Sequence, residues 1–238
     1  MYAVSFQSKY RLVNIALIAM LVGACQTKPA HPPSIAPTKA PAFDTTGASR
    51  YQIDSAASKV HILVYRAGAM ARPGHNHVIS SKAVSGTLFL QDNFTRSHVE
   101  LTMPVASLVV DDAQTRSVEG EDFSAEVPQD ARDGTRRNLL RPDVLDGEHF
   151  PKIELQSIAI AGTRARPELT MRITIKKVAR DVPVAATLQE QNAVITVAGD
   201  FAIKQTDFGI TPFSVGLGAL QVQDQLRIKF SIVCRKQQ

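Results

Sequence analysis

Two histidines, two positions apart, are the sharpest chemical feature of the sequence. His75 and His77 follow Arg72-Pro73-Gly74, a combination typical of a turn. In an extended chain, residues two apart point the same way, so both imidazoles could meet one ion or one bound molecule. Three uses stay open for the pair: transition-metal binding, contacts with a polar head group at a rim, or a plain surface turn.

A metal site at this pair would need more ligands. The candidates elsewhere in the chain are His61, His149, Glu119, Glu121 and Asp122. His149 is also a candidate for the rim or head-group role.

The acidic residues Asp111, Asp112 and 119–122 fall in what reads as the longest loop, residues 111–131. Their spacing does not match a twelve-residue calcium loop, so we expect a solvated loop there. Cys234 is in step with the apolar residues of the last predicted strand, which indicates a buried thiol that faces inward.

No other pattern in the sequence favours catalysis. A serine-nucleophile motif, a glycine-rich phosphate loop and a helical metal signature are all missing from it. We therefore expect a protein that is not an enzyme and requires no cofactor. The alternative is a metal-binding envelope protein that uses His75 and His77, as a redox accessory or a hydrolase.

The first residues have the layout of a bacterial secretory signal. Lys9 and Arg11 precede an apolar run at 12–22, which is too short to span a bilayer permanently. The following Gly23-Ala24-Cys25 completes a resemblance to the lipobox, whose Cys becomes the lipidated first residue after cleavage. We expect residues 1–24 to be removed and Cys25 to anchor the chain to a membrane through a lipid such as palmitate. The alternative is an ordinary cut that leaves Cys25 as a free thiol.

Residues 25–50 indicate a tether. Five prolines lie between positions 29 and 41, with almost no apolar residue to bury, so the segment favours extended, solvated conformations. In the sorting rule of Gram-negative bacteria, Asp after the lipidated Cys favours the inner membrane. Gln26 therefore indicates a lipid-anchored protein of the cell envelope that faces the periplasm from the outer membrane.

Charge excludes one class of partner. The chain carries 27 Lys and Arg against 22 Asp and Glu, and its net charge of +5 falls to +3 without Lys9 and Arg11. This mild and evenly spread excess argues against nucleic acid. With Cys25 lipidated, Cys234 has no partner within the chain, so burial alone must stabilise the domain.

From Tyr51 onward the sequence alternates between apolar and polar residues, as half-buried β-strands do. Nine short strands are expected, at 60–65, 86–91, 99–103, 106–110, 153–160, 169–175, 182–188, 194–203 and 226–232. The one helical candidate is 132–140. Many short strands with regular turns favour a closed barrel, which removes unpaired edges. We expect an all-β domain over 51–236: an antiparallel eight-stranded lipocalin-like barrel with one short helix.

Three segments together resemble the YceI family, lipocalin-like proteins that bind polyisoprenoids and related lipids. They are YQIDSAASKV at 51–60, TRRNLLRPDVLDGEHFPKIELQS at 135–157, and IKQTDFGI at 203–210 followed by VQD at 222–224. The resemblance covers about residues 51–234. Leu155 replaces a more usual aromatic residue, and Gln205 stands where the family more often has Arg, so the identity of the lipid is left open.

The resemblance implies a barrel with a lengthwise apolar cavity that holds an isoprenoid, a quinone side chain or an acyl amide, as a carrier or sequestering protein. It also makes a homodimer plausible. The inward alternates of the strands and nearby aromatics are the expected lining residues: Ile62, Val64, Leu88, Leu101, Met103, Leu155, Met171, Ile173, Phe201, Phe208, Phe213 and Phe230. The alternative is that these side chains fill a solid core in a structural module of the envelope.

Overall fold

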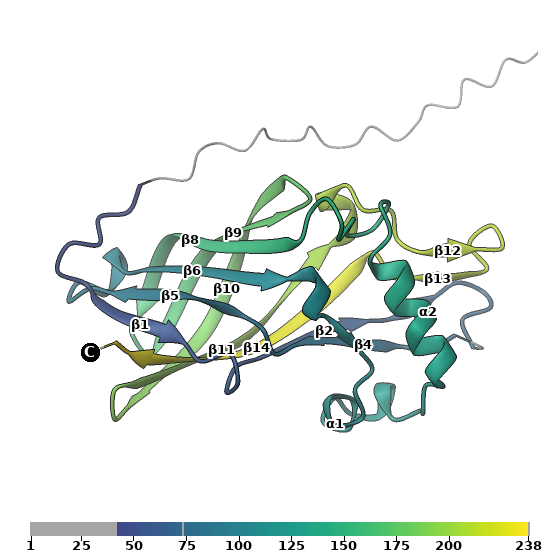
Figure 1. Ribbon diagram of the computed structural model, residues 1–238, viewed down its shortest axis with the longest axis horizontal. Coiled ribbons are helices and arrows are strands. Elements are labelled where there is room, and N and C mark those ends of the chain that lie inside the picture. Colours follow the sequence, from purple (N-terminus) through teal and green to yellow (C-terminus); the bar gives the residue numbers. More distant parts are fainter. Residues whose placement is uncertain (1–41, 73, 238) are drawn as a thin grey trace, which may run out of the picture. The chain divides into compact units, whose positions relative to one another are not determined.

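The computed structural model describes residues 42–72 and 74–237 (Figure 1). The predicted signal at 1–24, the lipid site Cys25 and the tether as far as residue 41 lie outside the described residues. The first strand, β1 (Ser49–Ile53), begins within the last two positions that we assigned to the tether. Among the described residues no helix has the length and hydrophobicity to cross a membrane.

Eight antiparallel strands close into a barrel, as the sequence predicts. Five of them are continuous: β8 (Lys152–Thr163), β9 (Arg166–Ile175), β10 (Val178–Gln191), β11 (Val194–Lys204) and β14 (Gln225–Lys236). Each of the other three is broken into two pieces: β1 and β2 (Lys59–Val64), β4 (His77–Ser81) and β5 (Ser85–Leu90), and β6 (His98–Pro104) and β7 (Val109–Val110).

Strand β14 closes the barrel. One of its edges pairs with β11, and its other edge pairs with β2 through residues 227–231 and with β1 through residues 234–236. The segment between β1 and β2 keeps this edge bonded, because Asp54 N–H donates to the Val233 carbonyl (2.8 Å) and Ser58 Oγ accepts from the Val233 amide (3.0 Å). The break therefore leaves no unpaired backbone group on this part of β14.

One end of the barrel is splayed, since β7 is only two residues long. Helix α2 (Gln129–Leu139) packs beside β7 and is fixed there by Arg136, whose Nη2 donates to the Ala106 carbonyl (2.9 Å). A small sheet lies at the same end, formed by β12 (Ser214–Val215), β13 (Leu220–Val222) and β3 (Arg66–Ala67) (Figure 1). We call this end the mouth.

Several sequence predictions need correction around the mouth. The helix begins at Gln129, three residues before the predicted start, because Pro128 ends the preceding extended segment and its carbonyl accepts from the Arg132 amide (3.0 Å). The first two residues of the strand predicted at 106–110 belong to a 3-10 turn, η2 (Val105–Ser107), and only its last two residues form β7. The predicted loop at 111–131 contains α1 (Ala113–Arg116) and η3 (Glu121–Phe123). The remaining 3-10 turns are η1 (Phe94–Arg96) and η4 (Gln205–Phe208).

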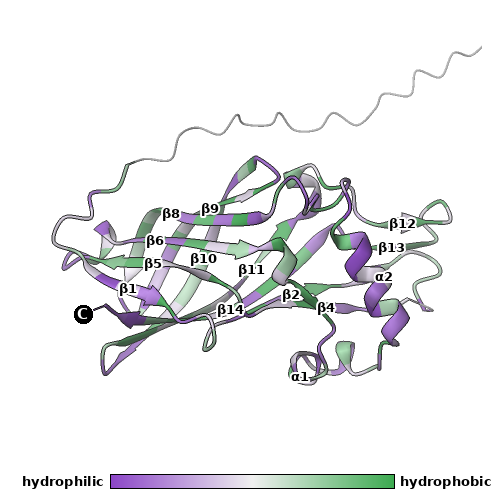
Figure 2. Ribbon diagram, viewed as in Figure 1, coloured by the Kyte–Doolittle hydropathy of each residue, from purple (hydrophilic) through white to green (hydrophobic). Residues whose placement is uncertain are grey.

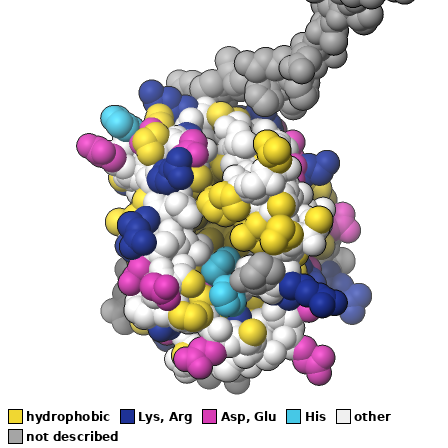
Figure 3. Space-filling model, turned by 90° about the vertical axis from the view of Figure 1, so that its right-hand side faces the viewer, with side chains coloured by type: hydrophobic (Ala, Val, Ile, Leu, Met, Phe, Trp, Pro, Cys, Tyr) yellow, Lys and Arg dark blue, Asp and Glu magenta, His cyan; other side chains and the backbone are white. Residues whose placement is uncertain are grey.

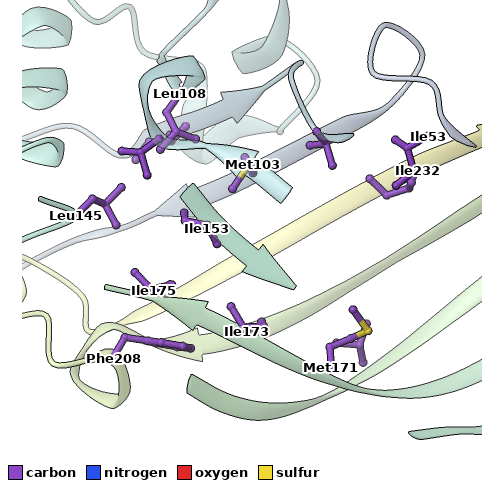
Figure 4. Close-up of a cluster of buried hydrophobic side chains, with 14 of the residues drawn as sticks. Ile53, Met103, Leu108, Leu145, Ile153, Met171, Ile173, Ile175, Phe208 and Ile232 are labelled. Atoms are coloured by element: carbon purple, nitrogen blue, oxygen red, sulfur yellow. The ribbon is translucent and has the colours of Figure 1, made fainter. Parts of the chain in front are cut away.

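Hydrophobic and hydrophilic residues alternate along the strands (Figure 2), and the apolar ones are the more buried. Met171, Ile173 and Ile175 of β9 project from one face of the strand into the interior (Figure 4). Other inward side chains, such as Leu101 and Phe230, stay partly exposed although the barrel surrounds them. Apolar side chains that remain exposed inside a closed barrel indicate that the interior is not filled.

Gly86 is required where β5 crosses close to β6. Its φ is +145°, and a Cβ there would overlap the carbonyl oxygen of Glu100. We expect Gly86→Ala to lower the free energy of unfolding by about 1–3 kcal/mol, because the strands would have to separate. Gly134→Ala in α2 is the control, since its new Cβ would have 3.8 Å of room and should stabilise the helix slightly. Equal effects of the two changes in urea unfolding would contradict this account.

Candidate functional site

The barrel encloses an inner apolar cavity of about 160 Å³. Among the described residues that line it, Ser97 is the one with a hydroxyl, and the rest are apolar residues together with Cys234. Nine of the predicted residues border this cavity: Ile62, Leu88, Leu101, Met103, Leu155, Met171, Ile173, Phe201 and Phe230. An apolar cavity of roughly this size stays dry and accepts a compact apolar molecule.

An outer cavity of about 350 Å³ lies at the mouth, and its lining includes one face of α2 with Thr135 and Asn138. The view onto this end shows a hollow with apolar side chains around it and histidine side chains beside it (Figure 3). Of the predicted residues, those that border the outer cavity are Ile62, Val64, Phe208, Phe213, His75 and His77. All twelve predicted apolar residues therefore border one of the two cavities.

Five isoleucines border both cavities: Ile62, Ile153, Ile175, Ile203 and Ile228. They come from five different strands, namely β2, β8, β9, β11 and β14. We call them the isoleucine collar. These shared side chains show that the two cavities adjoin within the barrel, one on each side of the collar.

His77 is held at the mouth by a buried ion pair. Its Nδ1 lies 2.6 Å from Asp111 Oδ2, while Asp111 Oδ1 accepts from Arg116 Nη1 (2.6 Å) and from the Val78 amide (2.8 Å). Arg116 also donates to the carbonyls of Asn76 and Ala125, each at 2.8 Å. The Asp111 side chain is fully buried. These contacts connect β4, α1 and the residue that follows β7, next to His77.

The charge on Asp111 is stabilised by its partners. Burial alone would raise the pKa of this carboxyl, but hydrogen bonds from His77, the Val78 amide and Arg116 outweigh it and hold the pKa below its ordinary value. A carboxylate only accepts hydrogen bonds, so the proton shared with His77 belongs to Nδ1. Nε2 of His77 is then free to face Thr135, whose Oγ1 lies 3.4 Å away.

The seven candidates for a metal site do not come together. His61 pairs with Glu119 (2.6 Å), whose other oxygen binds Lys229 (2.7 Å), and His149 is an exposed partner of Asp146 (2.8 Å). The His75 and His77 rings are 6.2 Å apart between centroids. Within residues 42–72 and 74–237, no three His, Cys, Asp or Glu side chains are placed to hold an ion.

The predictions for the acidic loop and for Cys234 have different outcomes. The solvated acidic loop is wrong for Asp111 and Glu119, since both side chains are buried in ion pairs, while Asp112 caps α1 through the Thr115 amide (3.0 Å). Cys234 does face inward on β14 and borders the inner cavity, where burial raises the pKa of its thiol to about 11.

The sequence analysis missed Asp111, Arg116 and Thr135 as neighbours of His77. Asp111 lies 34 residues from His77 and Thr135 lies 58 residues away, so only the fold brings them together. One signal was available: Asp111 directly follows the apolar run at 108–110, where a buried carboxylate is the alternative to a loop.

The buried carboxylate leads to a prediction about stability and pH. Asp111→Asn leaves Arg116 buried without its counter-charge, and we expect a loss of about 3–5 kcal/mol of unfolding free energy at neutral pH. Asp143→Asn removes an exposed pair with Arg141 (3.1 Å) and should cost less than about 1 kcal/mol.

The sign of the pH effect follows from the lowered pKa. Asp111 stabilises the fold above its unfolded-state pKa of about 3.9, and this contribution is lost as the pH falls through the lower folded-state value. The stability gap between wild type and Asp111→Asn, measured by urea unfolding, should therefore shrink in acid. A gap that stays constant down to the lowest pH would count against a charged Asp111.

Comparisons with known proteins agree with this architecture. Residues 51–234 match the family model described as YceI-like domain. The structure is similar to that of Burkholderia cenocepacia BcnA, with a TM-score of 0.56 and 22% identity over 76% of this chain and 98% of that one.

A mutant YCEI protein of Campylobacter jejuni, prepared for nanotechnology applications, gives a TM-score of 0.50 and 13% identity over 67% of this chain and 85% of that one. At these identities the two structures show the fold alone. No curated protein matches the sequence. The family model covers well over half of the chain, and with the closed barrel it shows that this protein belongs to the YceI-like family.

Proposed function

We propose that the protein binds one long apolar lipid without reacting with it, as a carrier or sequestering protein. A polyisoprenoid, an isoprenoid quinone or an acyl amide has the required shape. The observation that carries this proposal is the pair of apolar cavities that meet at the isoleucine collar. Membership of the YceI-like family, which the sequence resemblance associates with polyisoprenoids, supports it.

The free energy of transfer favours an extended hydrocarbon. Each methylene removed from water contributes about 0.8 kcal/mol, so a chain of about five isoprene units gains well over 10 kcal/mol before the costs of ordering it. The inner cavity offers only the Ser97 hydroxyl to a polar group. A polar group placed there would lose its hydration with little compensation, so the inner cavity takes the tail.

The polar groups of the site lie on the mouth side of the collar. His75, His77, Thr135, Asn138 and Gln205 border the outer cavity. The Asp111–Arg116 pair fixes the His77 ring, which therefore loses little conformational entropy when it binds a head group. The lipid then lies with its head at the mouth and its tail in the barrel.

Filling the inner cavity should abolish binding. Leu101→Trp places an indole in this cavity, whereas Thr102→Trp, one residue further along β6, places it on the opposite face of the strand. We expect protein purified from a bacterial envelope to release a lipid on solvent extraction, and Leu101→Trp to release at least tenfold less than Thr102→Trp.

Native mass spectrometry of the same preparations reports the mass and occupancy of the lipid. The sequence has no other Trp, so the fluorescence of each introduced indole also shows whether its surroundings are apolar. A wild-type protein that carries no lipid, or equal occupancy in the two variants, would contradict the proposal.

We also propose that Cys25 carries lipid and holds the protein at the periplasmic face of the bacterial outer membrane. The lipobox resemblance, Gln26 and the Pro-rich residues 26–50 support this placement.

The two cysteines of the chain give a matched test of the anchor. Cys25→Ser should lose palmitate labelling and its cleavage at residue 24, whereas Cys234→Ser should keep both, because Cys234 is buried in the barrel. Labelling that persists in Cys25→Ser, measured after growth with radioactive palmitate, would rule out this anchor.

A further inference from the structure

The mouth carries most of the exposed apolar side chains of the described chain. Across residues 42–72 and 74–237, six large apolar residues are exposed. Four of the six lie on two loops at the mouth: Met70 (60% exposed), Phe213 (38%), Val215 (44%) and Leu217 (109%). Leu217 is thus as exposed as a side chain can be, at the turn of the β12–β13 hairpin.

The two loops form a single projecting unit. The Met70 amide donates to the Ala219 carbonyl (2.7 Å), and β3 pairs with β13 just before the first loop. Gly68 allows this approach, because a Cβ there would lie 2.5 Å from the carbonyl oxygen of Ala219. We call residues 67–71 and 213–220 the apolar tip. The hairpin extends outward beyond α2 (Figure 1).

The charge pattern around the tip is also distinctive. The fifteen residues 208–222 contain no Asp, Glu, Lys or Arg, and neither do residues 67–71. Arg66 and Arg72, both exposed, flank the first loop. The surface is therefore apolar at its summit and positively charged beside it, which is the distribution that anionic phospholipids attract.

The tip is continuous with the outer cavity. Phe213 and Leu220 belong to the tip and also border this cavity. Arg66, next to the tip, borders it too. A surface that covers the tip would therefore lie directly against the opening of the lipid site.

The shape of the tip favours a bilayer over a protein partner. A stable protein interface buries about 800 Å² on each side, in a closely packed patch. The tip consists of two short loops with four exposed apolar side chains. Such a projection can enter the interfacial region of a bilayer, where acyl chains adapt to its shape and the arginines meet phosphate groups.

We propose that the apolar tip docks on an anionic phospholipid bilayer, with Leu217 and Met70 among the acyl chains and Arg66 and Arg72 at the head groups. This docking brings the mouth to the membrane, so that an apolar ligand passes between bilayer and barrel without crossing water. The inference goes beyond the proposed function, because vesicle binding by the tip needs no ligand in the cavity.

The test measures vesicle binding of a chain that begins at Gln26, which lacks the predicted signal and the predicted lipidation site Cys25. Every contact described here lies within residues 42–237, so this chain retains the complete barrel. Cosedimentation with phosphatidylcholine vesicles is compared with and without phosphatidylglycerol. We expect Leu217→Asp to weaken binding to vesicles at least about tenfold, because it places a charged carboxylate at the position where the leucine side chain would enter the bilayer.

Two further variants control for general effects of charge. Val118→Asp changes another exposed apolar residue (67% exposed), which lies outside the tip and both cavities, and it should bind vesicles like the wild type. Arg72→Gln should reduce the preference for phosphatidylglycerol by about fivefold, and this difference should vanish in high salt. Equal binding by Leu217→Asp and Val118→Asp would overturn the proposal.

Two other outcomes separate this proposal from its alternatives. A wild type that ignores vesicles but forms a dimer, which Leu217→Asp converts to a monomer in light scattering, would assign the tip to a second copy of the chain and overturn membrane docking. Vesicle binding by a protein that never carries lipid would leave the docking intact and remove only the lipid-binding function. Transfer of a fluorescent prenyl probe from vesicles to the protein should be slower for Leu217→Asp than for the wild type. The equilibrium affinity of the protein for this probe should be the same in both.

Discussion

The pairing of β14 with two consecutive strand pieces is the constraint on which the structure depends. Because β1 and β2 share one edge of β14, the sheet closes on itself, while the short β7 leaves the mouth end of the barrel splayed. Closure satisfies the backbone groups without any contribution from the interior. The inward side chains border two cavities, and the burial of the apolar side chains packed around these cavities stabilises the fold.

The spread end needs its own support, and buried charge supplies it. Asp111 and Arg116 neutralise each other beneath β4 and also fix the ring of His77. Arg136 holds α2 against the segment before β7. The same groups that stabilise the opening thus present polar atoms to it. A ligand with a polar head and an apolar tail matches this division between the mouth and the inner cavity.

Sequence reasoning was most successful where one local pattern decides the outcome. Alternation of apolar and polar residues accounts for the ten predicted cavity residues that lie on strands, because the side-chain period of a strand is fixed at two, whereas Phe208 and Phe213 lie outside the strands. It separated 99–103 from 106–110, close to the break between β6 and β7, but it did not locate the break between β1 and β2. The partners of His77 and of His61 were missed because 34 and 58 residues separate these histidines from Asp111 and Glu119.

The isoleucine collar has a consequence for how molecules would be told apart. Branching at Cβ leaves isoleucine few rotamers, so the boundary that these five residues form between the two cavities is stiff. For the lipid-binding function proposed above, a stiff boundary favours slender, flexible hydrocarbons over fused-ring sterols. Under that proposal, selection by cross-section follows from the choice of one amino acid at five positions.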